Sequence, residues 1–490
     1  MRPCREHTIY YPVVVIGAGP AGLTAAYQLC KADTPVLVVE KDSQVGGISR
    51  TETYKGYRFD IGGHRFYTKV REVEDLWHEV LGSDFIEVDR LSRIFYGGKF
   101  YPYPIKLWNT LYNLGLVESI RVLVSYLKAK ARTPYPNEQS LEEWVINRFG
   151  ERLYRMFFKT YTEKVWGIPC KEIRADWAAQ RIQGLSLKRA VLNAFLKKSD
   201  ATSLIDRFLY PIHGPGMMWE RFQQRVEEQG GEVQLNSSVE CLHHDGERIT
   251  KASIGTQDGT VEIGADHFIT SMPITNLISR LSPAPPDYVL EAAEGLSYRD
   301  FLVVALVCDR EHLFPDNWIY VHSPEVRVGR IQNFKNWSAA MVPDDSKTCL
   351  GMEYFCTLGD DLWELSDAEL QKLAARELAH IGLAREDEII DGVVMRQRKA
   401  YPVYDEKYKQ HLEVLKRYLD RFENLSTVGR AGMHRYNNQD HSMLTAMLAV
   451  KNILGENHNL WDVNVERSYH EQFTLSEKKA LKRSLVLDAA

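Results

Sequence analysis

The sequence lacks the cysteine patterns that mark several classes of protein. Its seven cysteines are scattered, and no two of them form a C-x-x-C pair. This spacing argues against a disulfide framework and against a cysteine-based zinc site, and it suits a reducing cytoplasm. We therefore expect a cytoplasmic protein that holds no metal. The cysteines are Cys4, Cys30, Cys170, Cys241, Cys308, Cys349 and Cys356.

An excess of positive charge and a long apolar run are missing as well. The formal net charge is -5, whereas a surface that binds nucleic acid usually carries an excess of lysine and arginine. We therefore expect no nucleic-acid partner, and an anionic substrate would need local arginines. Residues 12–29 are apolar, but a glycine motif accounts for them, so we expect no transmembrane segment.

The most informative stretch that is present is a glycine motif near the start of the chain. A run of β-branched residues ends in G-x-G-x-x-G, and an apolar helical pattern follows it. Gly17 allows a tight turn, Gly19 lets the backbone approach a pyrophosphate, and Gly22 lets the helix pack close to the strand. A second apolar strand, residues 36–39, ends at Glu40, where an acid would bind ribose hydroxyls. These features predict a Rossmann-like dinucleotide site.

Two further glycine pairs indicate which dinucleotide is bound. Gly46 and Gly47 follow the ribose acid, and this segment resembles the extended FAD fingerprint of the superfamily of amine oxidases, protoporphyrinogen oxidases and UDP-galactopyranose mutases. Gly62 and Gly63 follow a predicted strand, which suggests that the backbone passes close to a flat flavin ring. His64 comes next. We favour a flavin-facing role for it over a histidine that only bonds a backbone carbonyl.

The 490 residues are too many for one core and predict two or three domains. Residues 107–132 have a helical pattern, Ser140 and Glu143 fit a helix cap, and turn residues separate alternating segments after residue 232. We expect an α/β fold in which a Rossmann-like FAD-binding domain carries a helical insert domain and a mixed or antiparallel β-sheet domain. The expected ranges are 10–100, 205–295 and 385–460 for the FAD-binding domain, 101–204 for the helical substrate-binding domain, 296–384 for the β-sheet substrate-binding domain and 461–490 for a C-terminal tail.

The C-terminal part of the chain contains a second glycine turn. A short strand at 425–428 precedes Gly429 and Arg430, and an apolar helix follows at 443–454. Glycines before a helix N-terminus leave backbone N–H groups free for an anion. We therefore expect this segment to contact the cofactor from the opposite side.

Several motifs together resemble the UDP-galactopyranose mutases, and the eukaryotic-type members in particular. The resemblance covers most of residues 12–455 in patches. Gly62-Gly63-His64 is similar to the family's histidine loop at the flavin N5. Lys164-Val165-Trp166 followed by Arg181 is similar to its first clamping arginine, and Arg330 to its second. Positions that match its substrate and final cofactor residues are Tyr103, Trp166, Tyr320, Asn336, Tyr401, Tyr436, Asn438 and Gln439.

The resemblance implies a nucleotide-sugar mutase that interconverts pyranose and furanose rings. In that family the FAD acts in its reduced form, with N5 as the nucleophile at the anomeric carbon, and NADPH or NADH is the reductant. The resemblance gives His64, Arg181 and Arg330 the catalytic roles. The alternative is an FAD-dependent oxidoreductase of the amine oxidase or protoporphyrinogen oxidase type, which would abstract hydride. The sequence leaves the sugar, the nucleotide and the oligomeric state open.

Overall fold

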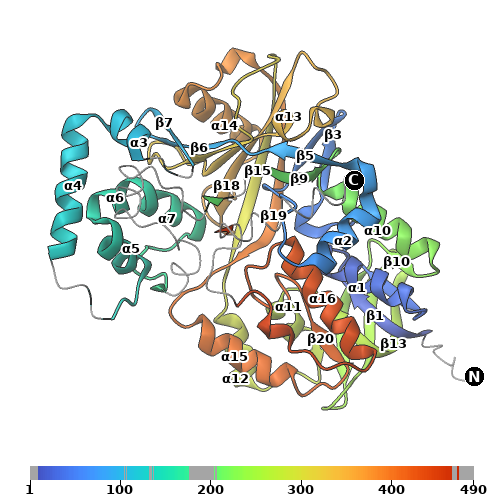
Figure 1. Cartoon of the computed structure of the whole chain (residues 1–490). Helices are drawn as coiled ribbons and strands as arrows, with labels where there is room; N and C mark the ends of the chain where they lie inside the picture. The colour runs from blue at the N-terminus through green and yellow to red at the C-terminus, as the bar shows by residue number, and fades with distance from the viewer. Residues whose placement is uncertain are drawn as a thin grey trace, which may run out of the picture.

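Two large β-sheets and a helical region make up the molecule (Figure 1). The computed structural model describes residues 9–103, 105, 107–131, 135, 137–175, 203–204, 207–465 and 472–473. The expected α/β fold is confirmed. None of the helices in these ranges has both the length and the apolar character needed to cross a membrane.

The first sheet carries the glycine motif. Strand β1 (Ile9–Ile16) pairs in parallel with β2 (Val36–Val39) and β13 (Gly259–Thr270), which places the carboxyl ends of three strands at one edge. Alternate residues of β1 point to opposite faces, so Val15 packs in one core and Val14 in another. The remaining strands are β10 (Glu232–Gln234), β12 (Ile249–Thr256), β11 (Ser238–His244), β14 (Leu281–Ser282) and β20 (Leu425–Thr427).

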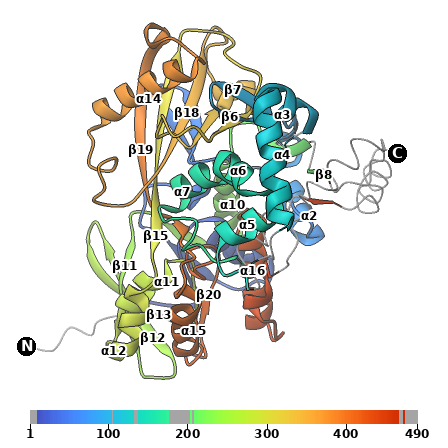
Figure 2. The ribbon, with the colours of Figure 1, turned by 90° about the vertical axis from the view of Figure 1, so that its left-hand side faces the viewer.

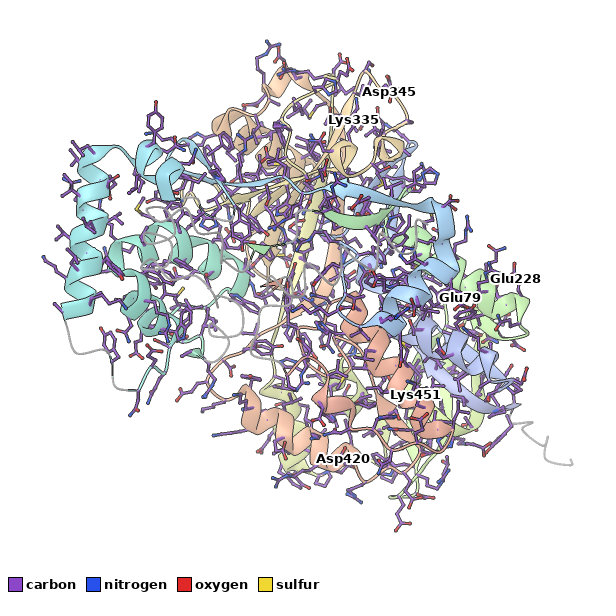
Figure 3. The ribbon with its side chains drawn as sticks, viewed as in Figure 1. Glu79, Glu228, Lys335, Asp345, Asp420 and Lys451 are labelled. Carbon is purple, nitrogen blue, oxygen red and sulfur yellow. The ribbon has the colours of Figure 1, made fainter. Side chains whose placement is uncertain are left out.

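Helices cover both faces of this sheet. On one face lie α1 (Pro20–Lys31), α2 (Arg71–Leu81), α10 (Gly216–Glu228) and α16 (Gln439–Ile453), and on the other α11 (Ile274–Ser279), α12 (Asp287–Glu294) and α15 (Tyr408–Leu419). Surface ion pairs connect α2 to its neighbours. Glu79 binds Lys31 of α1 at 3.0 Å, and Lys451 of α16 binds Glu72 at 3.0 Å. Figure 3 labels Glu79 and Lys451 at the surface.

The second sheet is mostly antiparallel and lies above the first in Figure 1. Its order is β19 (Ile389–Pro402), β15 (Tyr298–Cys308), β18 (Thr348–Cys356), β17 (Arg330–Asn333), β16 (Trp318–Val321), β6 (Ser92–Tyr96) and β7 (Lys99–Pro102). Helix α14 (Asp367–Ile381) packs on it. We expected residues 92–100 and 389–402 within the FAD-binding unit, whereas in the structure β6 pairs with β16 and β19 pairs with β15. A strand's own sequence does not specify which edge it joins, because the pairing partner lies elsewhere in the chain.

Helices between β7 and residue 175 form the third region. They are α3 (Leu107–Leu114), α4 (Leu116–Ala131), α5 (Leu141–Phe149), α6 (Glu151–Tyr154) and α7 (Thr160–Trp166), with a π turn at Arg155–Lys159. Gly115 adopts φ +78° and divides the helical stretch into α3 and α4. The predicted cap is confirmed, since the Glu143 backbone N–H donates to Ser140 Oγ at 3.2 Å.

Short elements connect these regions. They are the hairpin of β3 (Thr51–Tyr54) and β4 (Tyr57–Asp60), the pair of β5 (Phe85–Asp89) with β9 (Arg207–Pro211), the helix α13 (Phe334–Trp337) and the pair of β8 (Ser203–Leu204) with β21 (Gln472–Phe473). Of the expected tail, 466–471 and 474–490 lie outside the described residues.

Candidate cofactor and substrate site

One cavity of about 1000 Å³ is lined by residues of the first sheet's glycine loops, the second sheet and the helical region. It lies at the carboxyl ends of β1, β2 and β13, where parallel sheets generally bind ligands. Most of the residues singled out in the sequence lie on its wall. They are Gly17, Gly19, Glu40, Gly47, Gly62, Gly63, His64, Tyr103, Trp166, Tyr320, Arg330, Tyr401, Gly429, Arg430, Tyr436, Asn438 and Gln439.

The glycine loops form one end of the cavity. Gly17 has φ +99°, and a Cβ on Gly22 would lie 1.8 Å from the Gly17 carbonyl oxygen, so the helix and the turn make direct backbone contact. Gly46 has φ +100° and its N–H donates to the Ala18 carbonyl at 2.8 Å. Gly22 and Gly46 do not line the cavity, and their part is to support the loops that do. A Cβ on Gly19 would lie 3.9 Å from Gly47 Cα, so two glycine segments face each other closely.

Glu40 fixes the shape of this end. Its side chain accepts hydrogen bonds from the backbone N–H groups of Ala18 at 2.7 Å and Asp42 at 3.0 Å. Glu40 as a whole is 7% exposed, and hydrogen bonds to a charged acceptor in such a setting are strong. Glu40 therefore connects the glycine turn to the end of β2, in addition to any contact with a ribose.

The two helix N-termini at the cavity differ. Helix α1 begins after Gly19 without a side-chain cap, with Pro20 first and no acidic residue in its first turn. Its N–H groups remain available to a phosphate. Helix α16 has Asp440 in its first turn, and the backbone N–H of Asn438, a residue expected to bind the cofactor, donates to His441 Nδ1 of the same helix at 3.3 Å.

Gln439 is the residue of α16 that most clearly requires a ligand. It lines the cavity and is 7% exposed, yet within the described residues neither Oε1 nor Nε2 has a hydrogen-bond partner. An unpaired buried amide is costly and is normally satisfied by water or a bound group. Together with the uncapped α1 and the paired glycine loops, this amide fits the phosphates and polar ring edge of FAD.

His64 follows the Gly62 turn, where φ is +96°. Its Nε2 bonds the Ile61 carbonyl at 2.9 Å, so Nε2 carries the proton. Burial lowers the pKa of His64 to about 4, and the nearby Arg430 and Arg330 act in the same direction. A backbone carbonyl therefore satisfies His64, as the simpler interpretation has it; the ring also lines the cavity in its neutral form, and its role toward a flavin stays a prediction.

Arg330 is held by a buried carboxylate that the sequence did not reveal. Strand pairing sets Arg330 of β17 opposite Glu353 of β18, and Arg330 Nε donates to Glu353 Oε2. Gln332 Nε2 donates to the other carboxylate oxygen at 2.8 Å, and Arg330 also reaches the Tyr401 hydroxyl at 3.3 Å. Burial disfavours the charged guanidinium, but Glu353 outweighs it and raises the pKa of Arg330 well above its usual value. The arginine is therefore a fixed positive charge on the cavity wall.

Aromatic rings surround the space beyond Arg330. The Tyr320 ring packs against the rings of Tyr103 and Tyr161, with 5.1 Å and 5.5 Å between ring centroids. Tyr161 in turn stacks on His322, with 4.8 Å between ring centroids and 5° between planes. Burial lowers the pKa of His322 to about 3, so this ring is neutral. Sequence reasoning missed Tyr161 and His322, although Tyr161 stands three residues before the Lys164-Val165-Trp166 motif.

A second aromatic group lies near Arg430. Tyr401 and Tyr436 stack with 5.8 Å between centroids, and the Arg430 guanidinium lies 4.0 Å from the Tyr436 ring centroid. The Trp166 ring lies next to the Tyr436 ring, with 6.2 Å between centroids. Burial raises the pKa of Tyr401 to about 12, so its hydroxyl stays protonated. Arginine over an aromatic face combines charge with stacking, which suits a flat ligand or a phosphate.

Two expected substrate-site residues remain to be placed, Asn336 and Arg181. Asn336 was expected to bind substrate, but its amide donates to the carbonyls of Phe314 and Asp316, both at 2.8 Å, and it does not line the cavity. Asn336 belongs to the short helix α13, where its amide satisfies backbone carbonyls, and its contact with substrate stays a prediction. Arg181, the first expected clamping arginine, lies outside the described residues.

Comparison with known proteins adds independent information. The family described as flavin containing amine oxidoreductase matches residues 20–448. A dTDP-fucopyranose mutase from Escherichia coli is 30% identical over 173 residues, which are 34% of this chain and 44% of that protein. The chain spans less than half the length of the curated relatives it matches first.

Solved structures share the fold over nearly the whole chain. A reduced UDP-galactopyranose mutase superimposes with a TM-score of 0.81 at 21% identity, covering 93% of this chain and 98% of that one. A putrescine oxidase bound to putrescine superimposes with a TM-score of 0.60 at 19% identity, covering 92% and 100%. At these identities the likeness extends to the fold, which mutases and oxidases have in common.

Proposed function

This chain belongs to the flavin containing amine oxidoreductase family, and from that premise we propose that it is an FAD-dependent nucleotide-sugar mutase. The reaction would interconvert the pyranose and furanose rings of a sugar attached to a nucleoside diphosphate. The observation that carries the proposal is Arg330, whose side chain is 16% exposed and is fixed by the fully buried Glu353 on the wall of the cavity. An oxidase that removes hydride from an amine does not need a fixed cation there.

Arg330 suits the diphosphate of such a substrate. A guanidinium binds phosphate oxygens through paired N–H donors and stabilises negative charge that grows on a leaving group. Its Nε is used by Glu353 and one Nη2 N–H by the Tyr401 hydroxyl, so the other terminal N–H groups are the ones left for substrate oxygens. We propose that Arg181 supplies the second arginine of this pair.

The tyrosines supply hydrogen bonds without adding charge. Tyr103, Tyr320 and Tyr401 line the same cavity as Arg330, and burial raises the pKa of Tyr401, so its hydroxyl stays neutral. The neutral tyrosine hydroxyls can donate hydrogen bonds to phosphate oxygens without adding charge. The positive charge at this wall then stays on Arg330. Trp166 and Tyr436 offer flat faces for a ring on the same wall.

At the cofactor end, we propose that Gly19, Gly47 and the α1 N-terminus hold the pyrophosphate, and that Gln439 and Arg430 bind the flavin. Bound in its reduced form, FAD supplies a nucleophile for covalent catalysis at the anomeric carbon. The reductant is proposed to be NADPH or NADH. His64 stays neutral because burial lowers its pKa to about 4, so it places no positive charge beside the ring.

The competing function is an oxidoreductase of the same family, which the fold serves equally well. One experiment separates the two. Anaerobic protein reduced with dithionite is mixed with UDP- and dTDP-linked hexoses, and products are separated by chromatography. A mutase gives many turnovers per reduced flavin with no change in flavin redox state. Hydrogen peroxide formed in a one-to-one ratio with product, in air, would establish the oxidoreductase and contradict the proposal.

A further inference from the structure

Helix α4 carries an unusual set of apolar side chains on the surface. Six large aliphatic residues of this one helix are between 43% and 78% exposed. They are Leu116, Val117, Ile120, Leu123, Val124 and Leu127. Isolated exposed aliphatic residues are common, but a contiguous apolar patch of this kind usually marks an interaction site.

The opposite face of α4 is attached to the body of the protein. Val122 is 5% exposed and belongs to a core cluster, and Ser125 Oγ accepts from the Arg152 backbone N–H at 3.0 Å. Glu118 binds the Arg152 guanidinium at 2.7 Å on the same face. The helix is thus held firmly by one side while the apolar side points outward. Figure 1 shows α4 at the outer edge of the molecule, and Figure 2 shows it on the side that faces the viewer.

The exposed residues have the spacing of a helix–helix seam. Leu116, Ile120, Leu123 and Leu127 follow one another at intervals of four, three and four residues, which is the a/d pattern of a coiled coil over two heptads. At about 100° per residue, these four and the two valines fall within one arc of about 120°. No charged residue of α4 falls within that arc. The spacing matches a second helix better than a globular groove.

We propose that α4 is the interface between two copies of this chain, which pair their α4 helices antiparallel about a two-fold axis between Ile120 and Leu123. In this register Leu116 lies opposite the partner's Leu127, and Ile120 lies opposite the partner's Leu123. The same patch serves both copies, as a closed two-fold dimer requires. Antiparallel packing also places the two helix dipoles in opposite directions.

The neighbouring positions agree with self-association. In this antiparallel register Val117 lies beside the partner's Val124, and Ser119 lies beside the partner's Tyr126, so these flanking positions pair no like charges. The six side chains would together bury on the order of 600 Å² per copy, close to the roughly 800 Å² of a standard interface. A membrane surface is the weaker candidate, because the chain has a net charge of -5 and anionic lipids attract basic segments.

The first test measures mass. The full-length protein with bound flavin is examined at tens of micromolar by light scattering or sedimentation velocity, where we expect two chains of 56.4 kDa each. The variant Ile120→Lys/Leu123→Lys should sediment as one chain and keep its circular dichroism and flavin absorbance, since both side chains point away from the core. Ile390→Lys, which alters a 50% exposed residue on β19, is the matched control and should stay a dimer.

The second test measures orientation. Leu116→Cys and Leu127→Cys proteins are prepared separately, mixed and oxidised. The antiparallel register predicts a cross-link in the mixture and little in either protein alone, above the background of the unmodified chain. A single-chain mass for the unmodified protein, a dimer that survives the double lysine variant, or a cross-link within one variant alone would overturn the proposal. Flotation with vesicles of phosphatidylcholine and phosphatidylserine, lost in the double lysine variant, would assign the patch to a membrane instead.

Discussion

The two ends of the cavity are built by different means. At the glycine end the wall is formed by the backbone. It consists of turns at positive φ, an uncapped helix start and a direct contact between Gly22 and the Gly17 carbonyl. At the other end the wall consists of side chains that come from separate strands and helices, such as Arg330 with Glu353 and Tyr161 with His322. A backbone contact has no room for an added atom, whereas a side-chain wall can lose one group and keep its shape. Substitutions at the two ends should therefore differ in how strongly they lower stability and ligand binding.

The largest effect is expected from Gly22→Ala. The new Cβ would lie 1.8 Å from the Gly17 carbonyl oxygen, so the turn and helix α1 must separate. We expect purified protein without FAD and with a strongly lowered melting temperature. Gly19→Ala is the matched variant, because its Cβ meets nothing closer than 3.9 Å in the protein itself. It should leave the melting temperature of the apoprotein unchanged and still weaken FAD binding, since the methyl group occupies the approach to the pyrophosphate. Equal melting temperatures of the two apoproteins would contradict this account.

The next largest effect is expected at the side-chain end, from removal of the Arg330 guanidinium. Arg330→Ala removes the partner of a fully buried carboxylate, and an uncompensated buried charge typically costs about 3–5 kcal/mol. We expect lower stability in urea titrations and loss of nucleotide-sugar turnover, with the flavin spectrum retained. The double variant Arg330→Ala/Glu353→Gln removes both charges and should recover most of the stability without recovering activity. If the double variant were active, Arg330 would have a structural role alone.

The difference between backbone and side-chain construction explains which parts of the fold and of the site could be predicted from the sequence. Glycine constraints are local: the spacing of Gly17, Gly19 and Gly22 specifies a turn and a close helix without knowledge of any other segment. The fold class and the flavin family followed from such motifs. Roles of the individual residues at the cofactor remain predictions, although most of them lie on the cavity wall.

The side-chain end could not be predicted in the same way. Glu353 matters because strand pairing sets it opposite Arg330, and His322 matters because Tyr161 stacks on it. Both relations join segments that are far apart in the sequence, and register is decided by tertiary structure. Asn336 shows the reverse case, because a position that fits a family motif has its amide satisfied by two backbone carbonyls, a relation that the motif alone does not reveal.

A third prediction concerns how stability depends on pH through two buried histidines, one at each end of the cavity. Burial lowers the pKa of His64 to about 4 and that of His322 to about 3, from an ordinary value near 6.5. Between pH 6.5 and 4 the unfolded chain therefore binds more protons than the folded one, and stability falls as the pH falls, by at most about 1.4 kcal/mol per unit for each histidine. Asp60 acts with opposite sign, because burial raises its pKa to about 7.

Because Asp60 is common to all proteins compared, the measurement is the difference from the unmodified chain. Urea titrations at pH 6.5 and pH 4.5 should show a smaller acid loss for His64→Gln and for His322→Gln. Flavin absorbance should separate them, changing in the His64 variant alone, since that residue follows the Gly62-Gly63 turn at the cofactor end. An unchanged acid loss in both variants would mean that neither ring is held neutral by burial.

The smallest effect is expected from Tyr401→Phe, which removes one hydroxyl and keeps the ring. Arg330 donates to that hydroxyl at 3.3 Å, a long contact that adds to the bond with Glu353 and does not replace it. Phenylalanine preserves the stacking on Tyr436 and the Arg430 contact, so flavin content and spectrum should stay the same. Because this contact is long, its loss should cost only about 0.5–1.5 kcal/mol even though the donor is charged, which corresponds to a rise in KM of a few-fold to about tenfold. Steady-state kinetics of the reduced enzyme measures this directly. A loss as large as that of Arg330→Ala would show that the hydroxyl contacts the reacting atoms and that the side-chain end tolerates change no better than the glycine end.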